Sequence, residues 1–419
     1  MPARTTCSFM VLLVACGGPS YDTTGSGRDG EDPVAVDPGA PDPGTGPTDP
    51  SALSPDAGTG VDDGYADTPA ASGELSPEWE ERLLARRVDY SEALRVASLR
   101  LRGDLPTLVE IRFVAGAPDP RVAYEGLIDR FLDDPRFLFR VRELWRDTMK
   151  MGGGTLDTAP LFATQLVVED RSMTELFTAT TGTCPTYDGE TGTIVAADCD
   201  NGVPAHAGVL TNPAVMRHFF SNLAFRRVRW VQETFACTAF PAEHGEPMDV
   251  GGVAPYTAPW LFESIAGAAT GGRIDFLDTS SVICANCHAT INHVAPLLAR
   301  FDESGTWADD FAVPLPSDGS PTAALSDWLP EGETTAWRYG MPAADLPGLG
   351  AAMAADPEVA RCTVARVWNW ALGKGDIVTT LAVVPEAVIA GLVADYVSGG
   401  HRMKQLVLDV FTSEDFVRF

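Results

Sequence analysis

The sequence has few basic residues for its length. Its 419 residues include 30 Lys and Arg against 58 Asp and Glu, which gives a formal net charge of −28 and a pI near 4.4. Such a chain repels phosphate backbones, so we expect no nucleic-acid partner. The same charge would suit a basic redox partner, and it serves solubility equally well.

The chain also lacks a long apolar run, and strand signals are scarce. Its N-terminal apolar stretch, residues 9–15, is far shorter than the ~18 residues of a membrane-spanning helix. No pair of catalytic carboxylates, nucleophile triad or phosphate-binding loop is readable. The sequence therefore leaves open whether the protein is an enzyme.

The N-terminus resembles a bacterial lipoprotein signal. Arg4 precedes the apolar stretch, which ends in Leu13-Val14-Ala15-Cys16-Gly17, a lipobox-like sequence. We expect residues 1–16 to be the signal segment and its cysteine, with Cys16 lipidated, the rest removed, and the protein exported. Gly17 is compatible with an outer-membrane anchor facing the periplasm or the cell surface. The alternative is an ordinary secretory signal with an incidental cysteine.

Residues 17–75 have a different composition from the rest. They are rich in Pro, Gly and Asp and have almost no apolar anchors, so we expect a disordered acidic linker. Order is predicted to begin near Ser76. We divide the remainder into an N-terminal helical module (76–180), a central module (181–310) and a C-terminal helical module (311–419).

Apolar residues recur at helical spacing through most of the globular part. Ser76-Pro77-Glu78 is a candidate helix start, and a leucine pattern predicts helix as far as Leu105. The other predicted helical segments are 124–132, 137–145, 359–371, 388–396 and 403–411. We therefore predict a mainly α fold, with residues 184–200 as a loop insertion.

One motif carries specific chemistry. Cys284-Ala285-Asn286-Cys287-His288 is the Cys-x-x-Cys-His pattern of c-type haem attachment, in which two thiols meet the two vinyl groups and the imidazole binds the iron. Export fits this chemistry, because c-type haem is attached outside the cytoplasm. We therefore expect one covalent haem c on Cys284 and Cys287, with His288 as the proximal iron ligand.

Other interpretations of the motif remain open. The two cysteines could bind zinc with His288 or His293, although a tetrahedral site needs a further ligand at sensible spacing. They could also form a redox-active disulfide, although the βαβ context typical of such a disulfide is missing here. A further alternative is an inert disulfide between them.

The sixth iron ligand is less defined. Met341 lies 53 residues after His288 and precedes a proline, as the methionine ligand of small class I cytochromes c does. Met341 is our candidate metal ligand, and a core or loop methionine is the alternative. A bis-histidine site would use His206, His218 or His244, and an open position would permit peroxide or oxygen chemistry.

The remaining cysteines suggest disulfides in an oxidising compartment. Cys184 and Cys199 stand at the two ends of the predicted loop insertion, and a local bond between them is the simplest pairing. If the motif holds haem, Cys237 and Cys362 are left for each other. Sequence alone does not fix this connectivity.

Several stretches resemble the planctomycete cytochrome-associated domains of unknown function that also occur in myxobacterial lipoproteins. The similar segments, in chain order, are residues 99–107, 127–132, 135–137, 207–213, 226–231 with Cys237, 284–292, 301–302, 361–362, 370–374, 406–408 and 412–416. The resemblance implies an exported protein that resembles c-type-haem proteins. The family itself has no assigned reaction. Residues 291–296, Ile-Asn-His-Val-Ala-Pro, depart from the family's usual Ile-Asp-Pro-x-Gly-Phe, and the family does not regularly carry a methionine at the position of Met341.

These observations predict a membrane-tethered, cytochrome-like lipoprotein that binds haem covalently and transfers electrons outside the cytoplasm. The alternatives are a surface interaction or scaffold lipoprotein, in which the motif is structural, and a haem peroxidase or oxygenase.

Overall fold

The structure is a computed structural model that describes residues 77–238, 291–312, 323–329, 332–338, 341–375 and 384–419. The chain divides into two units, residues 1–74 and 75–419, and every described residue belongs to the second. The predicted signal, Cys16 and most of the predicted linker lie outside the described residues.

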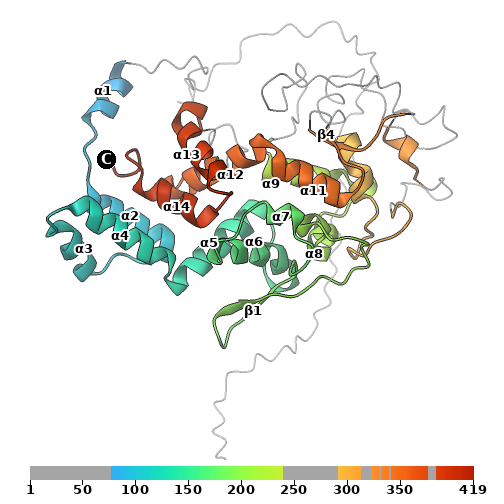
Figure 1. Ribbon diagram of the computed structural model, residues 1–419, viewed down its shortest axis with the longest axis horizontal. Coiled ribbons are helices and arrows are strands. Elements are labelled where there is room, and N and C mark those ends of the chain that lie inside the picture. Colours follow the sequence, from blue (N-terminus) through green and yellow to red (C-terminus); the bar gives the residue numbers. More distant parts are fainter. Residues whose placement is uncertain (1–76, 239–290, 313–322, 330–331, 339–340, 376–383) are drawn as a thin grey trace, which may run out of the picture. The chain divides into compact units, whose positions relative to one another are not determined.

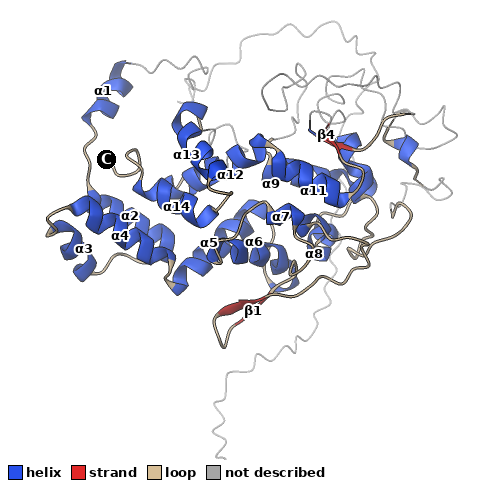
Figure 2. Ribbon diagram, viewed as in Figure 1, coloured by secondary structure: helices blue, strands red, loops and turns tan. Residues whose placement is uncertain are grey.

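The described part is mainly helical, as the sequence predicts (Figures 1 and 2). The α-helices, labelled as in Figure 1, are α1 Pro77–Ala85, α2 Tyr90–Arg102, α3 Leu108–Ala115, α4 Pro120–Leu132, α5 Pro135–Met149, α6 Thr158–Val168, α7 Glu175–Thr178, α8 Pro213–His218, α9 Phe225–Phe235, α11 Leu346–Ala355, α12 Pro357–Leu372, α13 Glu386–Ser398 and α14 Met403–Thr412. Residues 291–298 are also helical. Among the described residues, no helix is both long and apolar enough to cross a membrane.

Strands are few and short within the described residues. β1 (Thr186–Asp188) and β2 (Thr193–Val195) form one antiparallel pair, and β3 (Ala336–Trp337) and β4 (Met341–Pro342) form another. The first pair lies within the predicted loop insertion, which is therefore a small hairpin for part of its length.

Local sequence explains why several helices begin where they do. Asp119 and Asp134 precede Pro120 and Pro135. The Asp119 side chain accepts hydrogen bonds from two backbone N–H groups of the first turn, and that of Asp134 accepts one. Aspartate satisfies these otherwise unpaired donors, while proline has no N–H to lose at the first helical position. This combination sets the starts of α4 and α5.

The second helix ends earlier than the leucine pattern predicts. Gly103 adopts a left-handed conformation with φ 79° and closes α2 after Arg102. Leu105 then lies outside the helix with 62% of its surface exposed. Glycine ends a helix in this way because it has no Cβ to clash in the left-handed region.

The core connects helices that are far apart in the sequence. α2 packs against α4 and α5, and α14 packs against α4, α12 and α13 (Figure 1). The buried Tyr124 hydroxyl on α4 donates to the Phe411 carbonyl on α14 at 2.7 Å. The last residues also return to the start of the folded part, where the Asp89 N–H donates to the Val417 carbonyl at 2.9 Å.

Candidate functional site

The haem motif itself, residues 284–288, lies outside the described residues. The described chain resumes at residue 291, and every residue of helix 291–298 is buried. Val294, Ala295 and Leu298 are essentially inaccessible to solvent. The segment that follows the motif is therefore part of the protein core.

A buried arginine fixes the end of this helix. Arg227 on α9 is 1% exposed and donates to the carbonyl oxygens of Leu298 at 2.8 Å, Phe301 at 2.7 Å and Asp302 at 2.9 Å. Its Nε donates to the Met216 carbonyl at 2.9 Å. These carbonyls include the last of the helix, where the backbone dipoles carry partial negative charge.

Burial lowers the pKa of Arg227 to about 10, and the nearby Asp302 opposes that shift. The guanidinium therefore stays protonated at neutral pH. Carbonyl oxygens accept hydrogen bonds from the charged group. Through these hydrogen bonds Arg227 connects α8 to the segment that follows the motif.

A tight turn follows the helix. The Asp302 carboxylate accepts hydrogen bonds from the Ser304 N–H at 2.8 Å and the Thr306 N–H at 2.9 Å. Gly305 has φ 84°, and a Cβ there would lie 2.2 Å from the Pro213 carbonyl oxygen. Only glycine fits this approach, which brings the turn against the start of α8.

His293 lies on the buried helix and is 3% exposed. Burial lowers its pKa to about 3, so the imidazole is neutral at neutral pH. The 3.9 Å approach of Glu333 Oε2 to its Nε2 is therefore not an ion pair under those conditions.

Met341, the proposed sixth ligand, lies in β4 opposite Trp337 of β3. Its side chain is half-buried and packs against the hydrophobic core. The Trp337 indole donates to Asp356 Oδ2 at 2.8 Å, which connects this hairpin to the start of α12.

The alternative histidine ligands lie in different places. His206 Nδ1 is 3.4 Å from the Thr211 hydroxyl, and His218, at the end of α8, contacts the Phe219 ring edge-on. His244 lies outside the described residues. Within the part of the chain that the structure describes, no group of three His, Cys, Asp or Glu side chains is arranged to hold a metal ion.

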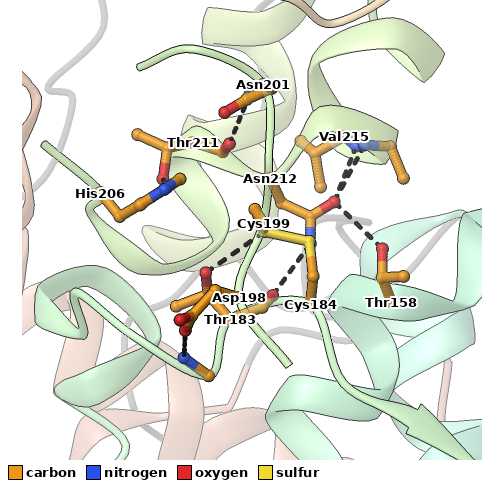
Figure 3. The surroundings of a disulfide bond; sticks show 12 residues. Thr158, Thr183, Cys184, Asp198, Cys199, Asn201, His206, Thr211, Asn212 and Val215 are labelled. Carbon is orange, nitrogen blue, oxygen red and sulfur yellow. Dashed lines mark hydrogen bonds between the residues drawn. A yellow bond between two sulfur atoms is a disulfide. The ribbon is translucent and has the colours of Figure 1, made fainter. Parts of the chain in front are cut away.

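A disulfide joins Cys184 to Cys199, with their Cα atoms 5.0 Å apart (Figure 3). Beside it, the buried Asn212 amide donates to the Thr183 carbonyl at 3.1 Å. The Asn212 side-chain oxygen accepts from the Ala214 N–H at 3.0 Å and so caps α8. The disulfide thus closes the hairpin segment, and Asn212 connects that segment to the start of α8.

A second disulfide joins Cys237 to Cys362, which are 125 residues apart in the sequence. Cys237 follows the end of α9, and Cys362 is buried within α12. The haem motif lies between these two cysteines in the sequence. Both bonds link the cysteines that the sequence analysis paired, and neither uses Cys284 or Cys287.

Sequence reasoning missed two features of this region. The Arg226-Arg227 pair gave no sign that its second arginine is buried, because burial depends on carbonyls about 70 residues away. Asn212 before Pro213 is a recognisable helix start, but its bond to Thr183 depends on the folded loop.

Comparison of the chain with protein-family models, curated proteins and solved structures finds no match.

Proposed function

We propose that this protein is an exported, membrane-tethered lipoprotein that carries one covalent c-type haem and transfers electrons outside the cytoplasm. The observation that carries the proposal is the Cys284-x-x-Cys287-His288 motif in a chain whose N-terminus resembles a lipoprotein signal. The resemblance to cytochrome-associated domains supports the same interpretation.

The disulfides agree with an exported protein. Disulfides persist in oxidising compartments and are rare where thiols are kept reduced. The bonds Cys184–Cys199 and Cys237–Cys362 therefore fit the compartment in which c-type haem is attached.

The donor set fits a c-type haem. Cys284 and Cys287 lie outside both disulfides and are followed at once by an imidazole. These thiols would form the two thioether bonds, and His288 would hold the iron from one side. A bound haem c would supply reversible one-electron transfer.

Residues around the motif would orient it. The described helical residues 291–298 lie close after His288 in the sequence, and Arg227 fixes their C-terminal end in the core. Met341 is our candidate for a second protein ligand of the iron, and a thioether ligand would raise the reduction potential. The acidic chain would attract a basic redox partner, and this attraction would weaken as salt is added.

The proposal is tested by a pyridine haemochrome spectrum of the full-length chain, made with a cytochrome maturation system and purified in detergent. We expect a c-type α-band that disappears in the Cys284→Ala, Cys287→Ala variant. The matched control is Cys184→Ala, Cys199→Ala, which removes two cysteines outside the motif and should keep the band. A folded wild-type protein without haem would overturn the proposal and favour a surface interaction lipoprotein.

Met341→Leu tests the sixth ligand in the same preparation. We expect loss of the methionine–iron charge-transfer band and a lower reduction potential. An unchanged spectrum would exclude Met341 as the ligand. Water-ligated or five-coordinate iron in the wild-type protein would instead indicate peroxide or oxygen chemistry.

Lipidation is tested separately by labelling with a fatty-acid analogue. We expect label on the wild-type chain and none on Cys16→Ser. Label that persists in the variant would contradict an anchor at Cys16.

A further inference from the structure

A cleft of about 860 Å³ lies between the C-terminal part of α5 and α12. Leu144, Met151 and Trp370 provide apolar wall, and Lys150, Arg366 and Lys374 provide basic groups. Its volume falls within the ~300–1,000 Å³ of small-molecule sites in proteins, which pair apolar walls with a few polar groups.

The charge of this cleft is opposite to that of the whole chain. The cleft and a smaller neighbouring hollow share Lys150 and Arg366. Among the described residues, their lining includes six basic side chains and two acidic ones, Asp147 and Glu233. The chain as a whole has a net charge of −28 and contains three lysines, two of which lie here.

Two of the basic groups are held by carboxylates. Arg146 donates to Asp157 through Nε and Nη2, both at 2.6 Å, and Arg229 donates to Glu233 at 2.8 Å. Burial would raise the pKa of Asp157, but hydrogen bonds from Arg146 and Arg142 hold it below its usual value. Arg146 is thus positioned beside the cleft by Asp157, and Arg229 is paired with Glu233 at the neighbouring hollow.

The other basic groups come from separate helices. Lys150 ends α5 in a left-handed conformation with φ 53°, and Arg366 on α12 donates to the Glu233 carbonyl at 2.8 Å. Lys374 is exposed just after α12, and Arg226 lies over the Phe219 ring. Positive charge from α5, α9 and α12 thus converges on one concave surface.

We propose that this cleft binds a small organic anion that carries two or more carboxylate or phosphate groups beside an apolar body. Guanidinium and ammonium groups form their strongest hydrogen bonds with these oxyanions, and Trp370 offers a flat surface to the rest of the ligand. A long polyanion is disfavoured because the surrounding chain repels it, whereas a small anion stays within the local positive field. The site is independent of the haem proposal.

The test is isothermal titration of the full-length protein in detergent with citrate and, separately, with pyrophosphate at constant ionic strength. We expect saturable binding of at least one of them, and the tighter ligand identifies whether the site favours carboxylate or phosphate. Lys150→Asn combined with Lys374→Gln should weaken that binding at least about tenfold, since two charge-assisted contacts are lost. Asparagine is chosen at Lys150 because it tolerates the left-handed conformation.

Lys404→Gln is the matched control, because this third lysine lies on α14 and pairs with Asp133 outside the cleft. It should leave the affinity unchanged, and thermal unfolding by circular dichroism verifies that each variant is folded. The proposal is overturned if neither anion binds saturably, or if the folded double variant binds as tightly as the wild type. Binding that persists in Cys284→Ala, Cys287→Ala keeps the result separate from the haem proposal.

Discussion

The two disulfides restrain the chain over very different distances. Cys184–Cys199 joins residues 15 apart, whereas Cys237–Cys362 joins residues 125 apart. The first surrounds a hairpin whose strand pairing is local, between residues 186–188 and 193–195. The second links α9 to α12 and encloses the segment with the haem motif. The local bond therefore secures one loop, while the long-range bond limits how far the end of α9 can move from α12.

The largest expected effect comes from removing the long-range bond. Cross-linking restricts the unfolded chain more as the loop grows, so Cys237→Ala, Cys362→Ala should lower the free energy of unfolding by about 5 kcal/mol. Cys184→Ala, Cys199→Ala should lower it by about 3 kcal/mol. Urea unfolding of both, in a background with Cys284→Ala and Cys287→Ala, measures the difference without haem. An equal or larger loss for the local pair would contradict the expected dependence on loop length.

Arg227→Met tests the noncovalent link in the long-range region. The methionine removes the buried donors to Met216, Leu298, Phe301 and Asp302 and leaves their carbonyls without that partner. We expect a loss of about 3 to 5 kcal/mol in the free energy of unfolding. Arg226→Met, at the exposed neighbouring position, should change it by less than about 0.5 kcal/mol. Similar unfolding midpoints for the two variants would contradict the role of Arg227.

Asn212→Ala tests the local region. It removes both the cap of α8 and the buried bond to the Thr183 carbonyl. We expect a loss of about 2 to 3 kcal/mol in the free energy of unfolding. Asp119→Ala removes an exposed cap of α4 and should cost about 1 kcal/mol, so the excess measures the further contacts of Asn212 with Thr183, Thr158 and Cys184. No excess over this control would mean that these further contacts contribute nothing.

The smallest effect concerns Asp302, in the turn after the buried helix. Burial would raise its pKa, but hydrogen bonds from Ser304, Thr306 and Gly305 hold it below its usual value of 3.8. A folded-state pKa below the unfolded one gives stabilisation that is present above the unfolded pKa and is lost as the pH falls through the folded one. Asp302→Asn should therefore destabilise the protein slightly at pH 7, and the difference should vanish in acid.

The measurement is the melting temperature of Asp302→Asn and wild type across a pH series, with Glu303→Gln as the neighbouring control. A difference that stays constant down to the lowest pH would exclude the carboxylate as its source.

The sequence predicts the helices that have clear boundaries and one apolar face. α4 and α5 begin at Asp-Pro pairs, and the predicted 124–132 and 137–145 segments fall within them. α6 gave no such signal, because nearly all of its residues are buried and no polar face marks the helical period. α9 was also missed, since an arginine in a periodic pattern predicts an exposed position and Arg227 is buried.

The haem motif, the lipobox-like N-terminus, the mainly helical fold and a plausible pairing of four cysteines can all be read from the order of residues. Each depends either on residue types at short spacing or, for the disulfides, on the number of cysteines. Tertiary structure alone decided that Arg227 would be buried and that Lys150, Arg366 and Lys374 would meet in one cleft. Lys150 and Arg366 are more than 200 residues apart, and only the packing of α5 near α12 brings their charges together.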